Sequence, residues 1–139
     1  MTDPVHGSYH SFFGVVRTLF GVPLAASRDD VAAADAVVIG APFDEGVSFR
    51  PGTRFGPQAV REAEDVGQMG GRPSMHVGLD AFEHLRVVDW GDVDVIAGDL
   101  ARSHALLAEA AGFALASDTV PVVIGGDHSL SHAMLEAMH

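Results

Sequence analysis

Cysteine and lysine are both absent from this chain of 139 residues. Without cysteine there is no disulfide, no thiolate metal site and no cysteine nucleophile. Without lysine there is no phosphate-loop lysine, no Schiff-base lysine and no polybasic membrane anchor. The eight basic residues are all arginine and face 19 acidic residues, which gives a net charge of −11. A nucleic-acid partner is therefore not expected, because such binding relies on clustered basic side chains.

Long apolar runs are also missing. No stretch reaches the roughly 18 uninterrupted apolar residues that a membrane-spanning helix needs. The opening residues, MTDPVHGSYHSFFG, lack a basic region followed by a long apolar stretch, so no secretory signal is expected. Hydrophobic residues make up 47% of the composition, which excludes a disordered, solvated chain. We expect a soluble, cytoplasmic protein without a membrane partner, whose length suits one domain or part of one.

Short β-branched runs alternate with helical segments along the chain. Continuous apolar runs bounded by Gly, Pro and Asp are typical of strands buried on both faces, and they predict strands at 36–40, 85–89 and 120–124. Helices are predicted at 57–65, 100–116 and 129–138, the first opening on Pro57 and the second capped by Asp99. This order predicts an α/β fold with a three-layer parallel sheet over residues 36–139. An N-terminal arm over residues 1–35 precedes it and is expected to be irregular over residues 1–27.

Three loops follow the carboxyl ends of the predicted strands, at 41–55, 90–97 and 125–129. Ligands of open parallel sheets bind beyond these ends. In the first loop, Asp44 and Arg50 could contact a substrate or form a surface ion pair. Asp89, at the end of the second predicted strand, could bind Mg²⁺ or Mn²⁺ together with Asp92 and Asp94 of the second loop, although a solvated acidic loop is the favoured interpretation.

The sharpest motif is Ile-Gly-Gly-Asp-His-Ser at residues 124–129. Two glycines allow a tight turn after a buried strand, and the turn places His128 at the carboxyl edge of the sheet. A neutral imidazole is the commonest metal ligand in proteins, and a neighbouring carboxylate often fixes its tautomer. His132 follows four residues later, but the zinc-protease pattern needs a glutamate after the first histidine, and here a serine stands there.

Three blocks of sequence resemble the ureohydrolase family, which contains arginases and agmatinases. These are VVIGAPFDEGVSFRPGTRFGPQAVREA at 37–63, VVDWGDVDV at 87–95 and PVVIGGDHSLSHAM at 121–134. The resemblance implies an arginase-like fold and a two-manganese centre, whose bridging hydroxide attacks a guanidinium carbon and releases urea. It also implies that His128 is a metal ligand, with Asp127, Gly125, Gly126 and Ser129 forming the motif around it.

The chain matches only the amino-terminal half of that family. The family's later ligand motifs are Asp-Ala-His-x-Asp and Asp-x-Asp. The first does not occur in these 139 residues, and the aspartates at 89, 92 and 94 match an earlier family block, upstream of His128, and not the later Asp-x-Asp. The resemblance therefore implies that this portion supplies one Mn²⁺ ligand and no catalytic residue. Agmatine, converted to putrescine, is the expected substrate of the complete enzyme. Guanidinobutyrate, guanidinopropionate and arginine remain open, and the family resemblance implies a homo-trimer or homo-hexamer.

A second hypothesis belongs to another functional class. The chain could be a non-catalytic half-domain, or a piece of a split protein, that acts through assembly. An incomplete sheet leaves an open edge, at residues 120–124 or at a neighbouring strand, and an open edge is a template for pairing with another chain.

Overall fold

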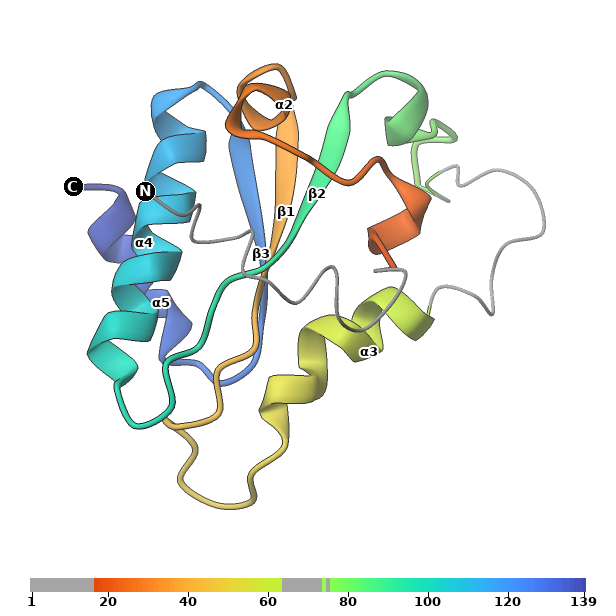
Figure 1. Cartoon of the computed structure of the whole chain (residues 1–139). Coiled ribbons are helices and arrows are strands. Elements are labelled where there is room, and N and C mark those ends of the chain that lie inside the picture. The colour runs from red at the N-terminus through yellow and green to blue at the C-terminus, as the bar shows by residue number, and fades with distance from the viewer. Residues whose placement is uncertain (1–16, 64–73, 75) are drawn as a thin grey trace.

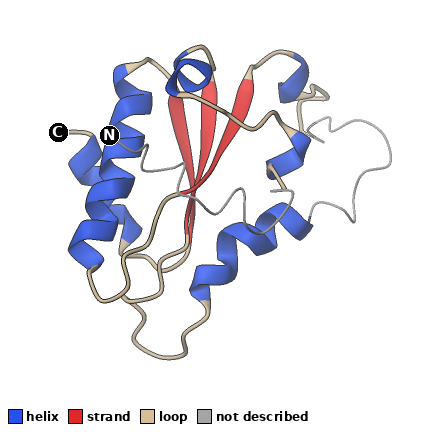
Figure 2. Cartoon of the chain, viewed as in Figure 1, coloured by secondary structure: helices blue, strands red, loops and turns tan. Residues whose placement is uncertain are grey.

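The computed structural model of the chain describes residues 17–63, 74 and 76–139. They contain a three-stranded sheet made of β1 (Ala36–Ala41), β2 (Val87–Asp92) and β3 (Val120–Gly125). The strands are parallel, in the order β2-β1-β3, with helices on both faces (Figures 1 and 2). The predicted α/β architecture with a parallel sheet is therefore confirmed.

The main helices lie where the sequence pattern predicted them, with small shifts at their ends. They are α3 (Gly56–Ala63), α4 (Leu100–Ala116) and α5 (Leu130–Ala137). Asp99 caps α4 as expected, since its side chain accepts a hydrogen bond from the backbone N–H of Arg102. The end of the first predicted helix, at residues 64–65, lies outside the described residues. None of the described helices is both long and apolar enough to cross a membrane.

The predicted arm is not wholly irregular. Between residues 17 and 35 the chain forms a short 3-10 helix, η1 (Leu19–Gly21), and a short helix, α2 (Arg28–Ala32). Ser27 and Asp30 close a reciprocal capping box at the start of α2, which supplies partners for its first N–H groups. Five helical residues are too few to give a periodic pattern, so α2 could not be recognised from the sequence. Two further 3-10 turns lie in loops, η2 (Thr53–Phe55) and η4 (Ala81–Glu83).

The two faces of the sheet differ in chemistry. On one face, side chains of all three strands pack against α4 and α5 in an apolar core. Its fully buried members include Val37 and Ile39 of β1, Trp90 of β2 and Leu107 of α4. Ala133 of α5 completes this core, which fixes β3 and the turn after it against two helices.

The opposite face is covered by α3 and carries a buried charge pair. Arg61 on α3 is 5% exposed, and its guanidinium contacts Asp89 and Asp92 on β2. Burial alone would lower the pKa of Arg61, but its hydrogen bonds and charge interactions with the two carboxylates raise it above the usual value. The charge pair therefore fixes α3 on this face of the sheet.

Candidate functional site

The candidate site lies where the loops after β1 and β3 meet. The turn after β3 is tied to the loop after β1 by backbone hydrogen bonds. The N–H of Gly126 donates to the carbonyl of Ala41 at 3.0 Å, and the N–H of Asp127 donates to the carbonyl of Phe43 at 2.8 Å. The structure therefore brings these two loops together at the carboxyl edge of the sheet.

The two glycines of the motif differ in how closely they are packed. A Cβ atom at Gly126 would collide with the backbone of Phe43, which cannot move aside, whereas one at Gly125 would meet the end of the flexible Leu130 side chain. Gly126 is therefore needed for the close approach of the turn to the loop after β1.

Asp127 holds the two loops together through its carboxylate. One oxygen accepts the N–H of Gly46 at 2.8 Å, and the other accepts the N–H of Ser129 at 2.8 Å. Asp127 itself is only 5% exposed. Burial would raise its pKa, but the hydrogen bonds from Ser129 and Gly46 outweigh burial, so its pKa lies below the usual value. Asp127 therefore carries a negative charge at neutral pH, directly beside His128.

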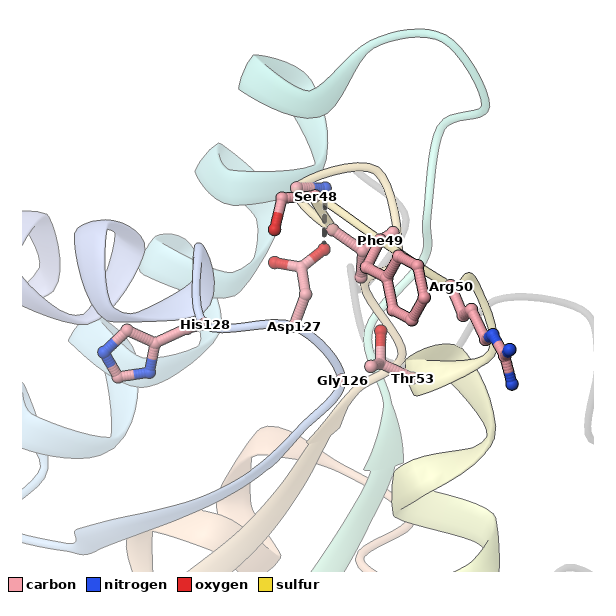
Figure 3. Close-up of a pocket in the computed structure, with 9 residues that line it drawn as sticks. Ser48, Phe49, Arg50, Thr53, Gly126, Asp127 and His128 are labelled. Carbon is pink, nitrogen blue, oxygen red and sulfur yellow. Dashed lines mark hydrogen bonds between the residues drawn. The ribbon is translucent and has the colours of Figure 1, made fainter.

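His128 lies in the turn between β3 and α5, and it is exposed. The next residue, Ser129, fixes this turn from the other side, because its hydroxyl lies 2.9 Å from Nε2 of the buried His104 on α4. Figure 3 shows the imidazole of His128 pointing away from Phe49 and Arg50. His132 is exposed in α5 and lies 3.4 Å from Glu136, so it belongs to the helix surface.

A pocket of about 440 Å³ lies beside this turn (Figure 3). One wall comes from the loop after β1 and includes Ser48, Phe49 and Arg50, and the other includes Asp127 and His128. Phe49 is 83% exposed, and the guanidinium of Arg50 stacks on its ring at 5.2 Å. The pocket therefore has the Asp127 carboxylate in one wall and Arg50 in the other, while the imidazole of His128, also a lining residue, points away from Phe49 and Arg50.

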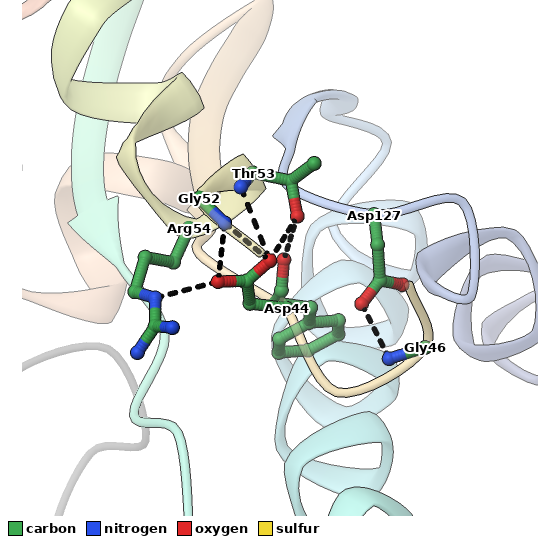
Figure 4. A network of polar contacts seen from close by, with 7 residues as sticks. Asp44, Gly46, Gly52, Thr53, Arg54 and Asp127 are labelled. Atoms are coloured by element: carbon green, nitrogen blue, oxygen red, sulfur yellow. Dashed lines mark hydrogen bonds and ion pairs between the residues drawn. The ribbon is translucent and has the colours of Figure 1, made fainter. Parts of the chain in front are cut away.

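Asp44 forms a network of hydrogen bonds within the loop after β1. Its carboxylate accepts hydrogen bonds from the backbone of Gly52 and Thr53, from the Thr53 hydroxyl and from Nε of Arg54 (Figure 4). Burial would raise its pKa, but these hydrogen bonds lower it overall. The suggested ion pair of Asp44 with Arg50 is not formed, since Arg54 takes that place. Asp44 shapes the loop and does not line the pocket, whereas Arg50 does.

The second strand ends later than predicted. β2 extends to Asp92, three residues beyond the predicted end at 89, and Asp89 inside it is fully buried. Both oxygens of Asp89 bind Arg61, each at 2.9 Å. The solvated acidic loop that the sequence favoured is therefore wrong for Asp89, because the partner that permits its burial lies on a helix 28 residues earlier.

A metal ion needs several donor side chains close to one another. No group of three or more His, Asp or Glu side chains among the described residues lies close enough to hold a metal ion. Each oxygen of Asp127 accepts one hydrogen bond, from Gly46 and from Ser129, and His128 lies next to it in the turn. The described residues therefore do not form a complete manganese site.

Two residues that support the site were not singled out from the sequence. His104 braces the turn through Ser129, and Thr53 joins the loop after β1 through Asp44 and the carbonyl of Phe43. The sequence does mark His104 in one way, because it is a polar residue among the alanines and leucines of α4. Its partner is 25 residues away, and local sequence does not reveal such a contact.

The sequence model of the arginase family matches residues 34–139. The chain belongs to the arginase family. It is 38% identical over 123 residues to the mitochondrial agmatinase of Gallus gallus, covering 88% of this chain and 34% of that protein. It is 34% identical over 137 residues to the guanidinobutyrase of Pseudomonas aeruginosa, covering 98% of this chain and 42% of that protein.

Solved structures agree with this assignment. The crystal structure of Trypanosoma cruzi formiminoglutamase with Mn²⁺ superposes with a TM-score of 0.64 at 33% identity. The superposition covers 85% of this chain and 39% of that one. This arginase-family chain thus spans between a third and somewhat over two-fifths of the relatives it matches.

Proposed function

We propose that this chain is the amino-terminal part of an enzyme that hydrolyses a small guanidino compound and releases urea. One observation carries the proposal: the exposed imidazole of His128 lies at the carboxyl edge of the sheet, in a chain of the arginase family. Mn²⁺ is the proposed cofactor, with His128 as one ligand, and the Mn²⁺ named with the T. cruzi formiminoglutamase structure supports it. Bound divalent metal would activate water at neutral pH.

The charge of the site suits a cationic guanidinium group. Asp127 is ionised beside His128 and lines the pocket, and the chain as a whole carries a charge of −11. A negative field raises the local concentration of cations, although it does not identify one. The proposed substrate is agmatine, which yields putrescine, because the SFRPGTRFGP segment at 48–57 resembles agmatinases. The similarity to the Gallus gallus agmatinase supports this choice.

A specific observation favours a second substrate class, the guanidino acids. Arg50 lines the pocket and stacks on Phe49, and among the described residues it pairs with no carboxylate. A guanidinium of this kind binds a carboxylate well. Guanidinobutyrate, guanidinopropionate or arginine would bring such a carboxylate, and the similarity to the P. aeruginosa guanidinobutyrase supports the first.

A cytoplasmic location and a trimeric or hexameric assembly are part of the same proposal.

Urea release tests the proposal. The 139-residue chain is co-expressed with the part of P. aeruginosa guanidinobutyrase that follows its matched segment, and the product is assayed with agmatine and Mn²⁺. We expect urea from the co-expressed pair and none from the chain alone. Loss of a group that only orients a metal ligand lowers activity roughly 10–100-fold. The His128→Asn variant of the co-expressed pair loses a ligand itself, so its turnover should fall by at least that factor. The matched control is His84→Asn, exposed at the end of η4 and outside the loops of the site, which should keep its turnover.

The two co-expressed polypeptides also allow agmatine to be compared with the guanidino acids as substrates. If Arg50 binds a carboxylate, Arg50→Gln should raise KM for guanidinobutyrate and leave KM for agmatine unchanged. Equal effects on both substrates would contradict that role of Arg50. Normal turnover by the His128→Asn variant would contradict the metal-ligand role of His128, and turnover by the short chain alone would contradict the need for further residues.

A further inference from the structure

His104 on α4 is a buried polar residue at the point where two loops of the site meet. It is 8% exposed, and Nε2 of its ring lies 2.9 Å from the hydroxyl of Ser129 in the turn after β3. The ring also packs against Phe43 at the start of the loop after β1, with the two ring centroids 5.3 Å apart. One side chain of α4 therefore contacts both of the segments that form the walls of the pocket.

The contact with Ser129 continues across the turn to the loop after β1. Ser129 donates its backbone N–H to one oxygen of Asp127, and Gly46 donates its N–H to the other oxygen (Figure 4). Gly46 and Arg50 belong to the same wall of the pocket. A row of hydrogen bonds thus leads from α4 through the turn to the opposite wall, and His104 is its buried end.

The residue before His104 holds the third loop at this edge of the sheet. Ser103 is 1% exposed, and its hydroxyl accepts the N–H of Ile96, in the loop after β2, at 3.0 Å. The same hydroxyl donates to the carbonyl of Asp99 at 3.0 Å. Two neighbouring polar side chains near the start of α4 therefore contact the loops that follow all three strands.

Packing alone does not call for an imidazole at position 104. The other buried side chains further along α4 are apolar, namely Leu107, Ala110, Ala111 and Ala114. A buried hydrogen-bonded pair can be replaced by apolar groups of the same shape at little cost in stability. A hydrogen bond fixes a distance and an angle, however, whereas hydrophobic burial is not directional. The chemistry of His104 therefore favours a role in the geometry of the site.

We infer that His104 is a positioning residue, which through Ser129 and Phe43 holds the two walls of the pocket in fixed relative positions. It does not line the pocket itself, so it acts on a bound substrate through Asp127 and the loop that carries Arg50. Its effect on turnover rests on the proposed function, whereas its effect on the positions of the walls does not.

Amide hydrogen exchange of the 139-residue chain, followed by NMR, is the first test. His104→Leu keeps an apolar side chain in the helix and removes the hydrogen bond to Ser129. The Gly46 amide, which His104 does not touch, should then exchange at least about tenfold faster. His104→Gln should restore its protection, because the terminal amide can bond the Ser129 hydroxyl as donor or acceptor. Unchanged exchange of Gly46 in His104→Leu, or no recovery in His104→Gln, would overturn the inference.

A control on the same helix separates positioning from a general loss of stability. Ala110→Gly weakens α4 at a fully buried position, away from the turn. It should lower the urea midpoint of the chain and leave the exchange of Gly46 in the absence of urea within about twofold of the unmodified value. If Ala110→Gly accelerates Gly46 as much as His104→Leu does, the positioning role is excluded.

A double-mutant cycle tests the route through Ser129. Ser129→Ala should accelerate the exchange of Gly46 as His104→Leu does, since either change removes the same hydrogen bond. Because the two side chains act as one unit, the double variant should exchange no faster than the faster single variant. Effects of the two substitutions that multiply would show that His104 does not act through Ser129.

The co-expressed pair shows the consequence for a substrate. A displacement of about 1 Å at a reacting group can cost about 100-fold in rate. His104→Leu should therefore lower kcat/KM for agmatine by about 10–100-fold, and His104→Gln should recover most of it. Equal kcat/KM in all three proteins would contradict the positioning role. Gly46 exchange is measured without urea release, so the expected exchange pattern in an inactive pair would contradict only the proposed function.

Discussion

Arg61 on α3 and Asp89 on β2 form a bidentate ion pair inside the protein, with Nε and Nη2 each 2.9 Å from a carboxylate oxygen. Asp89 also accepts the N–H of Leu19 and that of Gly91, both at 2.8 Å. One buried carboxylate thus joins α3, η1 and β2. Its four hydrogen bonds compensate for the loss of water around the charge.

Removal of one partner of this pair should be costly. Arg61→Ala should lower the free energy of unfolding by about 3–5 kcal/mol, because it leaves Asp89 buried without its counter-charge. Urea unfolding followed by circular dichroism measures the loss. Arg102→Ala, exposed on α4, is the matched control and should change stability by less than about 0.5 kcal/mol. A loss for Arg61→Ala that is no larger than for this control would show that the pair does not stabilise the fold.

Replacement of Gly126 and of Gly112 by alanine should change the stability of the chain in opposite directions. Gly126→Ala places a methyl group against the carbonyl of Phe43 and should cost about 1–3 kcal/mol or more. Gly112→Ala, inside α4, meets its nearest atom at 3.8 Å and should stabilise the chain by up to about 1 kcal/mol. Thermal unfolding of both variants is the measurement. If Gly126→Ala were neutral, the close approach of the two loops would be incorrect.

Asp44 should make stability depend on pH. Its pKa in the folded chain is lowered, so its stabilising effect is present above its unfolded pKa of about 3.9 and is lost as pH falls through the folded pKa. Asp44→Asn should therefore lower the urea midpoint at pH 7, and the difference from the unmodified chain should shrink toward pH 3. Asp94→Asn, which breaks no described hydrogen bond, is the control. A difference that grows on acidification would contradict this role.

Manganese should bind the isolated chain weakly or not at all. His128 is one ligand, and a tight site needs several. Calorimetric titration of the 139-residue chain with Mn²⁺ should show no stoichiometric isotherm. A tight isotherm that His128→Ala abolishes would mean that further ligands lie within these residues.

Local pattern alone determined a large part of this protein. The continuous β-branched runs predicted the strands and a parallel sheet. Pro57 and Asp99 marked where the helices α3 and α4 begin. The motif at 124–129 was sufficient to place His128 at the carboxyl edge of that sheet. These features depend on residues close together in the chain, which is why they can be recognised in a single sequence.

Only the tertiary structure decided which charged groups are buried and what they bind. Asp89 is buried because Arg61 reaches it from another element, and Asp44 selects Arg54 over Arg50 because the loop turns at Gly52. His104 supports the site through Ser129 across 25 residues. In each case the free energy of a charge or polar group depends on partners brought together by folding, and no local pattern encodes them.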